Sequence, residues 1–459
     1  MAKSLKNRVT AKLLKEDQER LATTQLPIVT LSASFRDIVE AEHSLADDIN
    51  HPDIVLSRAH YSMAYGLAIC AWGSDDPDEK QAVLVDPTNY VSAEDWPQVA
   101  FTERVGKVLA RYPLLTWVKK EVLDRRARSK MPIAETITPP LLDLTKDIKR
   151  PIVSFHVELG NILARETKHT IIQAVTDPHV REQYTDYADR PNSYFVVFDE
   201  PTRQHFLEIA TLRGKDIDPA KVIVTGPFID PRVKTAGEEK STTAWKKRPL
   251  RILMTTGGVG TNKAELEKAL EQLLPLLKND TKIKSNKTAE TAKPQLDVQL
   301  IYYAGTNSDH AEMVRALAKK HKIILGGESD KNASMRLLYG DDIVAANELI
   351  VEYGFPWADL VLAKPSGDMA YDAAAAGCAL LLLKSWGEWE DNIASIFTRR
   401  GIARSAEIDQ LIEQLTFLQE PIEGNKSWLE MAIQKAKDLP PEFTDGCQNI
   451  LKLTKKVGK

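Results

Sequence analysis

The residues with the most evident chemistry lie between Trp357 and Gly401. Lys364, Ser366 and Gly367 stand in a short turn of small residues between an apolar stretch and an Ala-rich stretch. A strand that enters a helix through such a turn presents backbone N–H groups and the positive end of the helix dipole at one point. Together with the lysine ammonium group, this arrangement predicts a site for a phosphate-bearing ligand.

Polar residues later in this segment could bind the rest of such a ligand. Asp372 lies one turn into the Ala-rich helix, where its carboxylate could accept hydrogen bonds from two ribose hydroxyls. Glu388 and Asn392, one turn apart on the next expected helix, could contact a sugar. The alternative is structural, with Asp372 stabilising the dipole of its own helix and the other two side chains on a surface helix face.

A second turn of small residues follows the apolar stretch 250–255. Gly257, Gly258 and Gly260 could hold a phosphate on their backbone N–H groups, or they could simply form a tight strand-to-helix turn. No Gly-Lys-Ser/Thr sequence follows, which excludes a nucleoside-triphosphate loop. An amphipathic helix is expected next, because four leucines recur at three- and four-residue spacing: Leu266, Leu270, Leu273 and Leu277.

Asn262 and Glu265 stand three residues apart at the start of this helix. An amide or hydroxyl side chain followed three residues later by Glu is typical of a capping box. We therefore expect the two side chains to satisfy backbone N–H groups of the first turn.

Polar side chains also follow expected strands in the first half of the chain. His60, His156 and Asp177 each come directly after an apolar stretch, and His179 is a further candidate. The carboxyl ends of parallel strands meet at one edge of a sheet, so these side chains are expected on one rim. A histidine there could act as a general base, although helix capping is the structural alternative for each.

Alternating strands and helices position these groups. The expected strands of the first half are 53–57, 82–85, 151–155, 170–175, 193–198 and 221–225. Those of the second half are 250–255, 298–303, 359–363 and 379–383. This alternation predicts an α/β fold of two Rossmann-like domains, each with a parallel sheet and helices on both faces.

Composition shifts suggest the domain limits. Residues 1–50 are expected to form a polar helical extension, 51–230 the first α/β domain and 231–249 a charged linker. The second α/β domain is expected over 250–420, and closing helices over 421–459. The low-complexity stretch 279–294 is expected to be a disordered surface loop.

Composition also limits the class of protein. The 459 residues carry a net charge of −4, which gives no general attraction to nucleic acid. Cys70, Cys378 and Cys447 form no disulfide framework or zinc spacing, and no acidic metal-ligand pair stands out. The longest apolar run, 373–383, is too short to span a bilayer. We therefore expect a cytoplasmic protein that binds no metal.

In these motifs the chain resembles the GT-B-fold glycosyltransferases of family 28, which includes MurG and the monogalactosyldiacylglycerol synthases. The likeness covers about residues 51–405 and rests on the segments 226–230, 255–260 and 358–401. In the last segment the matching residues are Lys364, Pro365, Gly367, Ala373, Ala375, Gly377 and Asn392.

Three corners of the first half resemble this family in the same order. His60 is similar to the histidine that follows the first strand, Ser154 to His156 resembles an S-x-H corner, and Thr176-Asp177 a T-D corner. The chain departs from the family pattern by having no glycine in 56–60 and by Asp372 in place of Glu. It departs again at Glu388, which stands in place of Gln.

The resemblance implies an inverting, metal-independent transfer of a sugar from a nucleotide-diphosphate sugar, expected to be a uridine one, to a hydroxyl. It implies two domains whose sheets face each other across a cleft, with the acceptor on the first and the donor on the second. His60, His156 and Asp177 would serve the reaction on the acceptor side. The donor would contact Gly257, Gly258, Gly260, Lys364, Ser366, Gly367, Asp372, Glu388 and Asn392. No cofactor is implied beyond this substrate.

A lipid or polyprenyl-linked acceptor at the inner membrane face is one candidate, and the basic N-terminal stretch could then lie on the membrane surface. A solvated tail is the alternative, because Glu16, Asp17 and Glu19 dilute the basic charge. Two other functions remain open. One is a nucleotide-sugar 2-epimerase of the same fold. The other is a catalytically silent nucleotide-sugar-binding protein, which the departures from the family pattern would suit.

Overall fold

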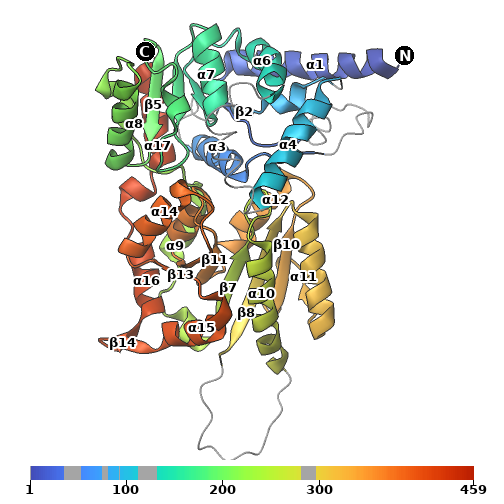
Figure 1. Ribbon diagram of the computed structural model, residues 1–459, viewed down its shortest axis with the longest axis vertical. Coiled ribbons are helices and arrows are strands. Elements are labelled where there is room, and N and C mark those ends of the chain that lie inside the picture. The colour runs from blue at the N-terminus through green and yellow to red at the C-terminus, as the bar shows by residue number, and fades with distance from the viewer. Residues whose placement is uncertain are drawn as a thin grey trace, which may run out of the picture. The chain divides into compact units, whose positions relative to one another are not determined.

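The computed structural model describes residues 2–35, 53–74, 81–92, 94–111, 132–280 and 296–458. The chain forms two compact units (Figure 1). Unit 1 comprises Met1–Pro231 and Pro440–Lys459, and unit 2 comprises Arg232–Leu439. The stretch 279–294, expected to be a loop, lies almost wholly outside the described residues.

Within the described residues, unit 1 contains a six-stranded sheet in the order β2-β1-β3-β4-β5-β6, and every neighbouring pair is parallel. The strands are β1 (Leu26–Val29), β2 (Ala82–Val85), β3 (Ile152–Ser154), β4 (Ile171–Ala174), β5 (Ser193–Val197) and β6 (Val222–Val224). Apolar residues dominate these strands, as expected for a parallel sheet covered on both faces.

The longer helices of unit 1 are α1 (Ala2–Thr23), α3 (Arg58–Trp72), α4 (Trp96–Arg111), α6 (Pro132–Thr145), α7 (Val157–Glu166), α8 (Glu200–Leu212) and α17 (Gly446–Val457). Short 3-10 turns are η1 (Pro87–Tyr90), η5 (Glu182–Thr185), η6 (Pro219–Lys221) and η11 (Pro441–Phe443). One core cluster joins Leu13 and Leu21 of α1 to Ile137 of α6 and Ile152 of β3.

Two predictions for the N-terminal region are wrong. Residues 1–50 are not only a helical extension, because β1 inserts between β2 and β3. The expected strand 53–57 is reduced to a single antiparallel bridge between Val55 and Ala33. The four residues of β1 are all buried, and so short an apolar run gives little pattern beside a long polar helix.

Unit 2 contains, within its described residues, a seven-stranded sheet in the order β13-β12-β11-β7-β8-β10-β9, again with parallel pairs. The strands are β7 (Leu250–Thr255), β8 (Val298–Gly305), β9 (Leu325–Gly326), β10 (Met335–Tyr339), β11 (Leu360–Ala363), β12 (Ala379–Leu382) and β13 (Ala403–Ser405). A short antiparallel hairpin, β14 (Pro421–Glu423) and β15 (Lys426–Ser427), lies outside this sheet.

The helices of unit 2 are α9 (Pro231–Glu239), α10 (Lys263–Leu273), α11 (Ser308–His321), α12 (Ile343–Leu349), α13 (Met369–Ala375), α14 (Glu388–Arg399), α15 (Leu411–Gln419) and α16 (Trp428–Lys437). A π-helical turn η9 (Ile350–Gly354) continues α12, and short turns are η7 (Ala244–Lys247), η8 (Leu274–Asp280) and η10 (Ile408–Gln410). The expected linker 231–249 is therefore ordered, since α9 and η7 occupy most of it.

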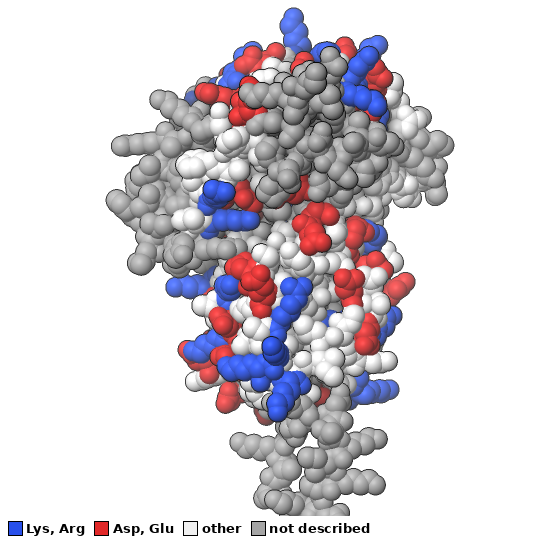
Figure 2. Space-filling model, turned by 90° about the vertical axis from the view of Figure 1, so that its right-hand side faces the viewer, with Lys and Arg blue, Asp and Glu red and all other residues white. Residues whose placement is uncertain are grey.

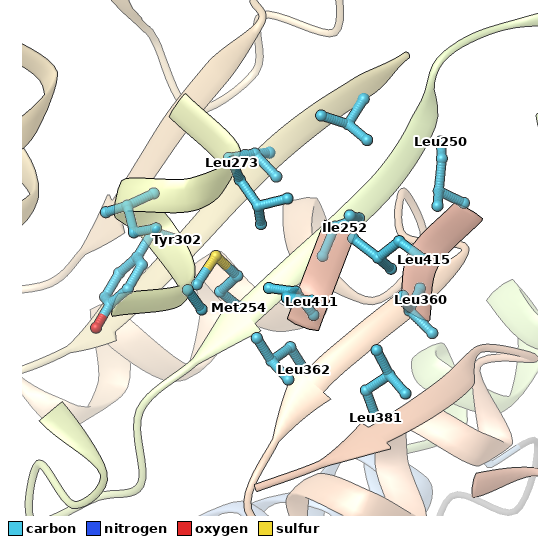
Figure 3. Packing of buried hydrophobic residues seen from close by; sticks show 14 of the residues in the cluster. Leu250, Ile252, Met254, Leu273, Tyr302, Leu360, Leu362, Leu381, Leu411 and Leu415 are labelled. Atoms are coloured by element: carbon cyan, nitrogen blue, oxygen red, sulfur yellow. The ribbon is translucent and has the colours of Figure 1, made fainter. Parts of the chain in front are cut away.

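One face of the unit 2 sheet packs on the leucine face of α10, which confirms the expected amphipathic helix for Leu266, Leu270 and Leu273, whereas Leu277 lies in the following turn η8. Leu266, Leu270 and Leu273 are fully buried against Ile252, Met254 and other strand residues. Figure 3 shows Leu250, Ile252 and Met254 of β7 beside Leu360, Leu362 and Leu381 of the neighbouring strands. Side chains alternate between the faces of a strand, so Arg251 and Leu253 belong to the opposite face.

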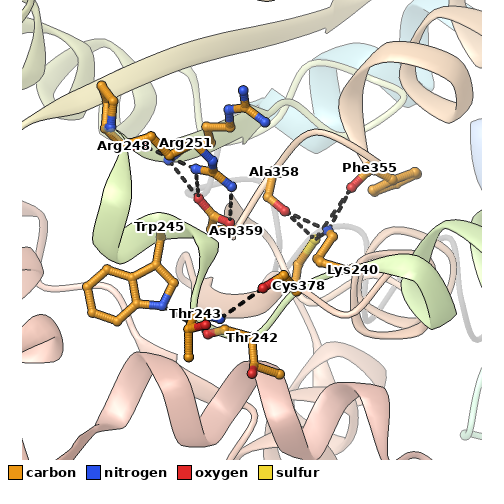
Figure 4. Close-up of polar contacts among 12 residues, drawn as sticks. Lys240, Thr242, Thr243, Trp245, Arg248, Arg251, Phe355, Ala358, Asp359 and Cys378 are labelled. Atoms are coloured by element: carbon orange, nitrogen blue, oxygen red, sulfur yellow. Dashed lines mark hydrogen bonds and ion pairs between the residues drawn. The ribbon is translucent and has the colours of Figure 1, made fainter.

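An ion pair with a buried carboxylate joins the residues that precede β7 and β11. Arg248 donates to both carboxylate oxygens of Asp359 at 2.6 and 2.9 Å, and the backbone N–H of Arg251 donates to the same carboxylate at 3.0 Å (Figure 4). Nearby, the ammonium group of Lys240 donates to the carbonyls of Phe355 and Ala358. These contacts hold the start of β11 against β7 and against the segment that follows α9.

The C-terminal helix returns to unit 1. In Figure 1 the red helix α17 lies among elements of unit 1, where it contacts α3. Gly226 adopts φ +91°, and a Cβ there would stand 2.4 Å from the carbonyl oxygen of Glu442. A Cβ on Gly446 would be 2.2 Å from the carbonyl oxygen of Pro227. Glycine at both positions therefore permits the close backbone approach that closes unit 1.

Basic and acidic side chains are interspersed over the described part of the surface seen in Figure 2. Such mixing agrees with the small net charge and offers no extended basic area on that face. Among the described helices, none is both long and apolar enough to cross a membrane.

The packing of α9 on α13 gives a test of the fold. A Cβ on Gly237 would lie 1.9 Å from the carbonyl oxygen of Ala375, which is backbone and cannot rotate away. We expect Gly237→Ala to destabilise unit 2 by about 2 kcal/mol or more. The measurement is the midpoint of chemical denaturation followed by circular dichroism.

The matched control is Gly106→Ala, also within a helix, where an added Cβ meets no atom of the described residues within 4 Å. It should be neutral or stabilise by about 0.5–1 kcal/mol, because alanine favours the helix. Equal midpoints for the two variants would show that α9 does not approach α13 so closely.

Candidate active site

The glycine turn after β7 has a fixed and unusual backbone. Gly260 donates its N–H to the carbonyl of Gly257 at 2.8 Å, and Gly260 and Asn262 have φ values of +70° and +60°. Gly257 also permits a close side-chain approach, because a Cβ there would be 2.8 Å from Lys364 Cε and 3.0 Å from Thr261 Oγ1. The structure thus brings Gly257 and Lys364, both candidate donor-binding residues, into contact.

A buried histidine supports this turn. The Nε2 atom of His310 lies 3.4 Å from the carbonyl oxygen of Gly260, and its Nδ1 atom lies 2.7 Å from the hydroxyl of Tyr302. A carbonyl only accepts, so Nε2 carries the proton and the Tyr302 hydroxyl donates to Nδ1. Burial raises the pKa of Tyr302, which keeps this hydroxyl protonated. The sequence analysis did not identify His310.

The hydroxyl of Thr261, at the same corner, is a buried polar group with an unsatisfied hydrogen bond. Its Oγ1 atom is buried and has no hydrogen-bond partner among the described residues. A buried hydroxyl without a partner costs free energy, so an oxygen or N–H group of a ligand here would recover that loss. Thr261 is the third threonine of the Thr255–Thr261 turn, and this repetition is the signal in the sequence that could have indicated it.

The expected capping box at the start of α10 is not formed. Asn262 makes no side-chain bond to the backbone N–H groups of the helix. Its amide instead donates to the carboxylate of Glu265 and to the carbonyl of Lys384 at 3.2 Å. The left-handed backbone of Asn262 differs from the extended conformation that a capping residue normally adopts.

The ammonium group of Lys364 is already paired with a carboxylate. Its Nζ atom lies 2.5 Å from Glu390 Oε1, and the second oxygen of Glu390 accepts the backbone N–H of Trp386 at 2.6 Å. The Glu390 side chain is 1% exposed and that of Lys364 is 13% exposed. An anionic ligand would therefore compete with a buried carboxylate for this lysine.

Acidic groups gather where α13 begins. The Ser366 hydroxyl donates to Asp368 at 2.7 Å and accepts the backbone N–H of Met369 at 3.3 Å. Asp368 and Asp372 are both buried, as is Gly367. The serine therefore satisfies the backbone N–H of the first residue of α13, and the two carboxylates make this corner less favourable for a diphosphate than the family pattern implies.

Glu388 and Asn392 lie on the exposed side of α14. Glu390 lies on the buried side with Ile393 and Phe397, at the three- and four-residue spacing of one helix face. That spacing is visible in the sequence and could have identified Glu390 as the inward-facing carboxylate.

In unit 1 the histidine candidates do meet. The ring centroids of His60 and His156 are 5.0 Å apart in an edge-to-face arrangement. His60 Nδ1 lies 3.4 Å from the carbonyl oxygen of Leu31, and His60 Nε2 lies 3.2 Å from Thr176 Oγ1. The carbonyl only accepts, so the proton is on Nδ1 and Nε2 accepts from the Thr176 hydroxyl. We call His60, His156 and Thr176 the histidine cluster.

The strand whose carboxyl end His60 contacts is not the one expected from the sequence. His60 lies in the first turn of α3, and its backbone N–H is capped by Ser57. The strand whose carboxyl end it meets is β1, which precedes Leu31, rather than residues 53–57. The His60 ring therefore reaches back to a corner more than twenty residues earlier in the chain.

His156 also has a structural role. It is the N-cap of α7, and its Nδ1 atom accepts the backbone N–H of Glu158 at 3.2 Å. Accepting this bond requires an unprotonated Nδ1, and the positive end of the helix dipole further disfavours the imidazolium. The cap therefore engages Nδ1 of His156, whereas His60 offers its Nε2 atom to a hydroxyl group.

Thr176, the neighbour of Asp177, contacts His60. Asp177 Oδ2 lies 4.0 Å from Arg181 Nη2, and the Thr176 hydroxyl also lies 3.4 Å from the hydroxyl of Tyr184. His179 pairs with a different histidine, His205, at 6.0 Å between ring centroids.

A buried carboxylate fixes the corner that carries Leu31. Asp86 accepts the backbone N–H groups of Ser32 at 2.7 Å and Ala33 at 3.1 Å, and the hydroxyl of Thr88 at 2.7 Å. Burial raises the pKa of Asp86, while these hydrogen bonds act in the opposite direction. Through this anchor, Asp86 sets the position of the carbonyl that orients His60.

No group of three or more His, Cys, Asp or Glu side chains in the described ranges is arranged to hold a metal ion. The cysteines Cys70, Cys378 and Cys447 are buried and form no disulfide, and burial raises the pKa of Cys378.

Comparison with known proteins is informative at the level of structure. The sequence matches no protein-family model and no curated protein sequence. The structure is similar to UDP-GlcNAc 2-epimerase from Neisseria meningitidis bound to UDP-GlcNAc, with a TM-score of 0.50 and 10% identity over 95% of this chain and 100% of the other.

It is also similar to Os79 from O. sativa in complex with a trichothecene, with a TM-score of 0.50 and 12% identity over 94% and 100% of the two chains. MurG from Acinetobacter baumannii gives a TM-score of 0.46 and 13% identity over 94% and 99%. At these identities the likeness concerns the fold, and it shows two Rossmann-like units with parallel sheets, as in the GT-B fold.

Proposed function

We propose that the chain is an inverting glycosyltransferase that moves a sugar from a nucleotide-diphosphate sugar, expected to be a uridine one, to a hydroxyl acceptor. The observation that carries this proposal is the histidine cluster, in which His60 presents an accepting Nε2 atom beside a hydroxyl. The occurrence of UDP-GlcNAc in the Neisseria epimerase of the same fold supports a nucleotide-sugar as ligand.

Membership of glycosyltransferase family 28 is part of the proposal. It rests on the matching residues near Lys364 and on the three corners that contain His60, His156 and Thr176-Asp177. A lipid or polyprenyl-linked acceptor, and attachment to the inner face of a membrane, follow from the same resemblance.

His60 is proposed as the general base. The acceptor hydroxyl would replace Thr176 at Nε2, attack the anomeric carbon and give its proton to this atom as the bond to the diphosphate breaks. Attack from the side opposite the leaving group inverts the configuration. The Nδ1–H bond to the carbonyl of Leu31 would stabilise the imidazolium that forms. His156 and Asp177 would position the acceptor.

The donor is proposed to bind at the corner of unit 2 formed by Gly257, Gly258 and Gly260 with Lys364, Ser366 and Gly367. The Thr261 hydroxyl supplies an unmet hydrogen bond there, and His310 holds the glycine turn in place. Backbone N–H groups and Lys364 would stabilise the leaving diphosphate without a metal. Asp372 would accept ribose hydroxyls, with Glu388 and Asn392 near the sugar.

The base is tested by His60→Gln, which keeps a hydrogen-bonding side chain but cannot take the proton. We expect turnover to fall by about 10²–10⁴-fold while donor binding changes little. Release of nucleoside diphosphate is measured with uridine and guanosine sugars, using vesicles that contain diacylglycerol or polyprenyl phosphate as acceptors.

His205→Gln is the control, because His205 is exposed on α8 and lies outside the histidine cluster. It should retain full turnover. A wild-type chain that binds no nucleotide-sugar in thermal-shift titration would contradict the proposal, and so would full activity of His60→Gln.

The Lys364–Glu390 pair favours a second candidate function, that of a nucleotide-sugar-binding protein without turnover. A lysine neutralised by a buried carboxylate stabilises a departing diphosphate poorly unless the pair opens. The transferase proposal requires Lys364 to exchange Glu390 for the diphosphate, whereas the second function does not.

Glu390→Gln separates these possibilities. For the transferase, removing the competing carboxylate should tighten nucleoside diphosphate binding by about tenfold, and Lys364→Met should weaken it by a similar factor. Calorimetric titration with uridine diphosphate measures both changes.

Lys268→Met serves as control, because Lys268 pairs with Asp409 on the exposed surface of the same unit. It should leave affinity unchanged. If Glu390→Gln and Lys364→Met only lower the unfolding midpoint, the pair is structural and the site does not use Lys364.

A further inference from the structure

Three side chains gather at the amino-terminal end of the unit 2 sheet. Arg251 is the second residue of β7, Arg336 is the second residue of β10, and Trp357 precedes β11. The guanidinium carbons of Arg336 and Arg251 lie 4.7 and 5.3 Å from the Trp357 ring centroid. We call these three residues the arginine–tryptophan cluster. It lies at the edge opposite to the glycine turn, which follows the carboxyl end of β7.

The cluster holds buried N–H groups that lack acceptors. Arg251 Nε, Arg336 Nε and Nη2, and Trp357 Nε1 are buried and have no hydrogen-bond partner among the described residues. Arg336 is only 1% exposed, and its Nη1 atom donates to the carbonyl of Glu328 at 2.6 Å. Buried polar groups are nearly always hydrogen-bonded. Three guanidinium N–H groups and the indole N–H of Trp357 without acceptors therefore indicate that this cluster can accommodate a ligand that accepts hydrogen bonds.

The buried carboxylate at this edge already has other hydrogen-bond partners. Asp359, the buried carboxylate nearby, is engaged by both arms of Arg248 and by the backbone N–H of Arg251. Burial and the charge of Arg251 lower the pKa of Arg336 to about 10, although Asp330 acts in the opposite direction. Burial and the charge of Arg248 lower the pKa of Arg251. Both guanidinium groups remain protonated at neutral pH, and they repel each other.

We propose that the arginine–tryptophan cluster binds an oxyanion, either a phosphate or a carboxylate group of a small molecule. The planar guanidinium fork matches two oxygens of such a group, and the indole N–H adds a further donor. Contact with the Trp357 ring holds the two guanidinium planes in place before the anion arrives. The site is distinct from the proposed donor corner and does not depend on transfer activity.

The test uses the full chain and inorganic phosphate, with acetate in a parallel titration and chloride at matched ionic strength as the reference. Isothermal titration calorimetry should give saturable binding of phosphate or acetate, and the tighter of the two identifies the group. Arg336→Met and Arg251→Met should each weaken this binding by about tenfold or more, because a charged hydrogen bond is lost.

Arg404→Met is the matched control, since Arg404 also lies against an aromatic ring, 5.1 Å from the Trp428 centroid, but outside the cluster. It should keep the binding of the unmodified chain. Trp357→Phe keeps an aromatic ring and removes one donor, so it should weaken anion binding less than the arginine variants do. This variant replaces Arg336→Met in the test if Arg336→Met fails to fold.

The proposal is overturned if neither anion binds saturably above the chloride reference. It is also overturned if binding survives in Arg336→Met and Arg251→Met but is lost in Lys364→Met, because the anion would then occupy the donor corner.

Discussion

The ion pair between Lys364 and Glu390 constrains the donor site proposed for unit 2. A single ammonium group cannot neutralise a buried carboxylate and a diphosphate at the same time, and separating a buried pair leaves a charge that is costly to bury alone. Donor binding must therefore supply enough new contacts to offset the loss at Glu390. The orphan Thr261 hydroxyl and the N–H groups of the glycine turn are the groups available for this, and both belong to the corner against which the Lys364 side chain packs.

The histidine cluster depends on the strand order of unit 1 rather than on any local pattern. Leu31 follows β1, His156 follows β3 and Thr176 follows β4, and these three strands are adjacent in the sheet. His60 can contact groups from all of them because α3 begins beside this edge. The capping bond of α7 engages Nδ1 of His156, whereas Nε2 of His60 faces the Thr176 hydroxyl, so the fold gives these two neighbouring rings different hydrogen-bonding roles.

Long apolar stretches and regular leucine spacing were sufficient to predict most strands and α10 from the sequence. Strand β1 was missed because four apolar residues after a long polar helix carry little pattern, and the prediction moved to residues 53–57 instead. The candidate residues Lys364 and Gly257 were identified, but their contact was not, since it joins turns a hundred residues apart. Glu390 and His310 act through tertiary partners, and a single polar residue on an apolar helix face does not reveal its partner in advance.

The two edges of the unit 2 sheet differ in charge, and this difference has a physical consequence. Asp368, Asp372 and Glu390 are buried near the carboxyl edge, whereas Arg251 and Arg336 stand at the amino edge with unmet donors. The proposed oxyanion would therefore meet unmet donors at the amino edge, where the buried Asp359 is already engaged by Arg248. A nucleotide-sugar can still prefer the carboxyl edge, because its ribose and sugar hydroxyls can donate to the same carboxylates that repel its phosphates. If the donor binds there as proposed, selectivity comes from its ribose and sugar hydroxyls, and inorganic phosphate alone would not reproduce its binding.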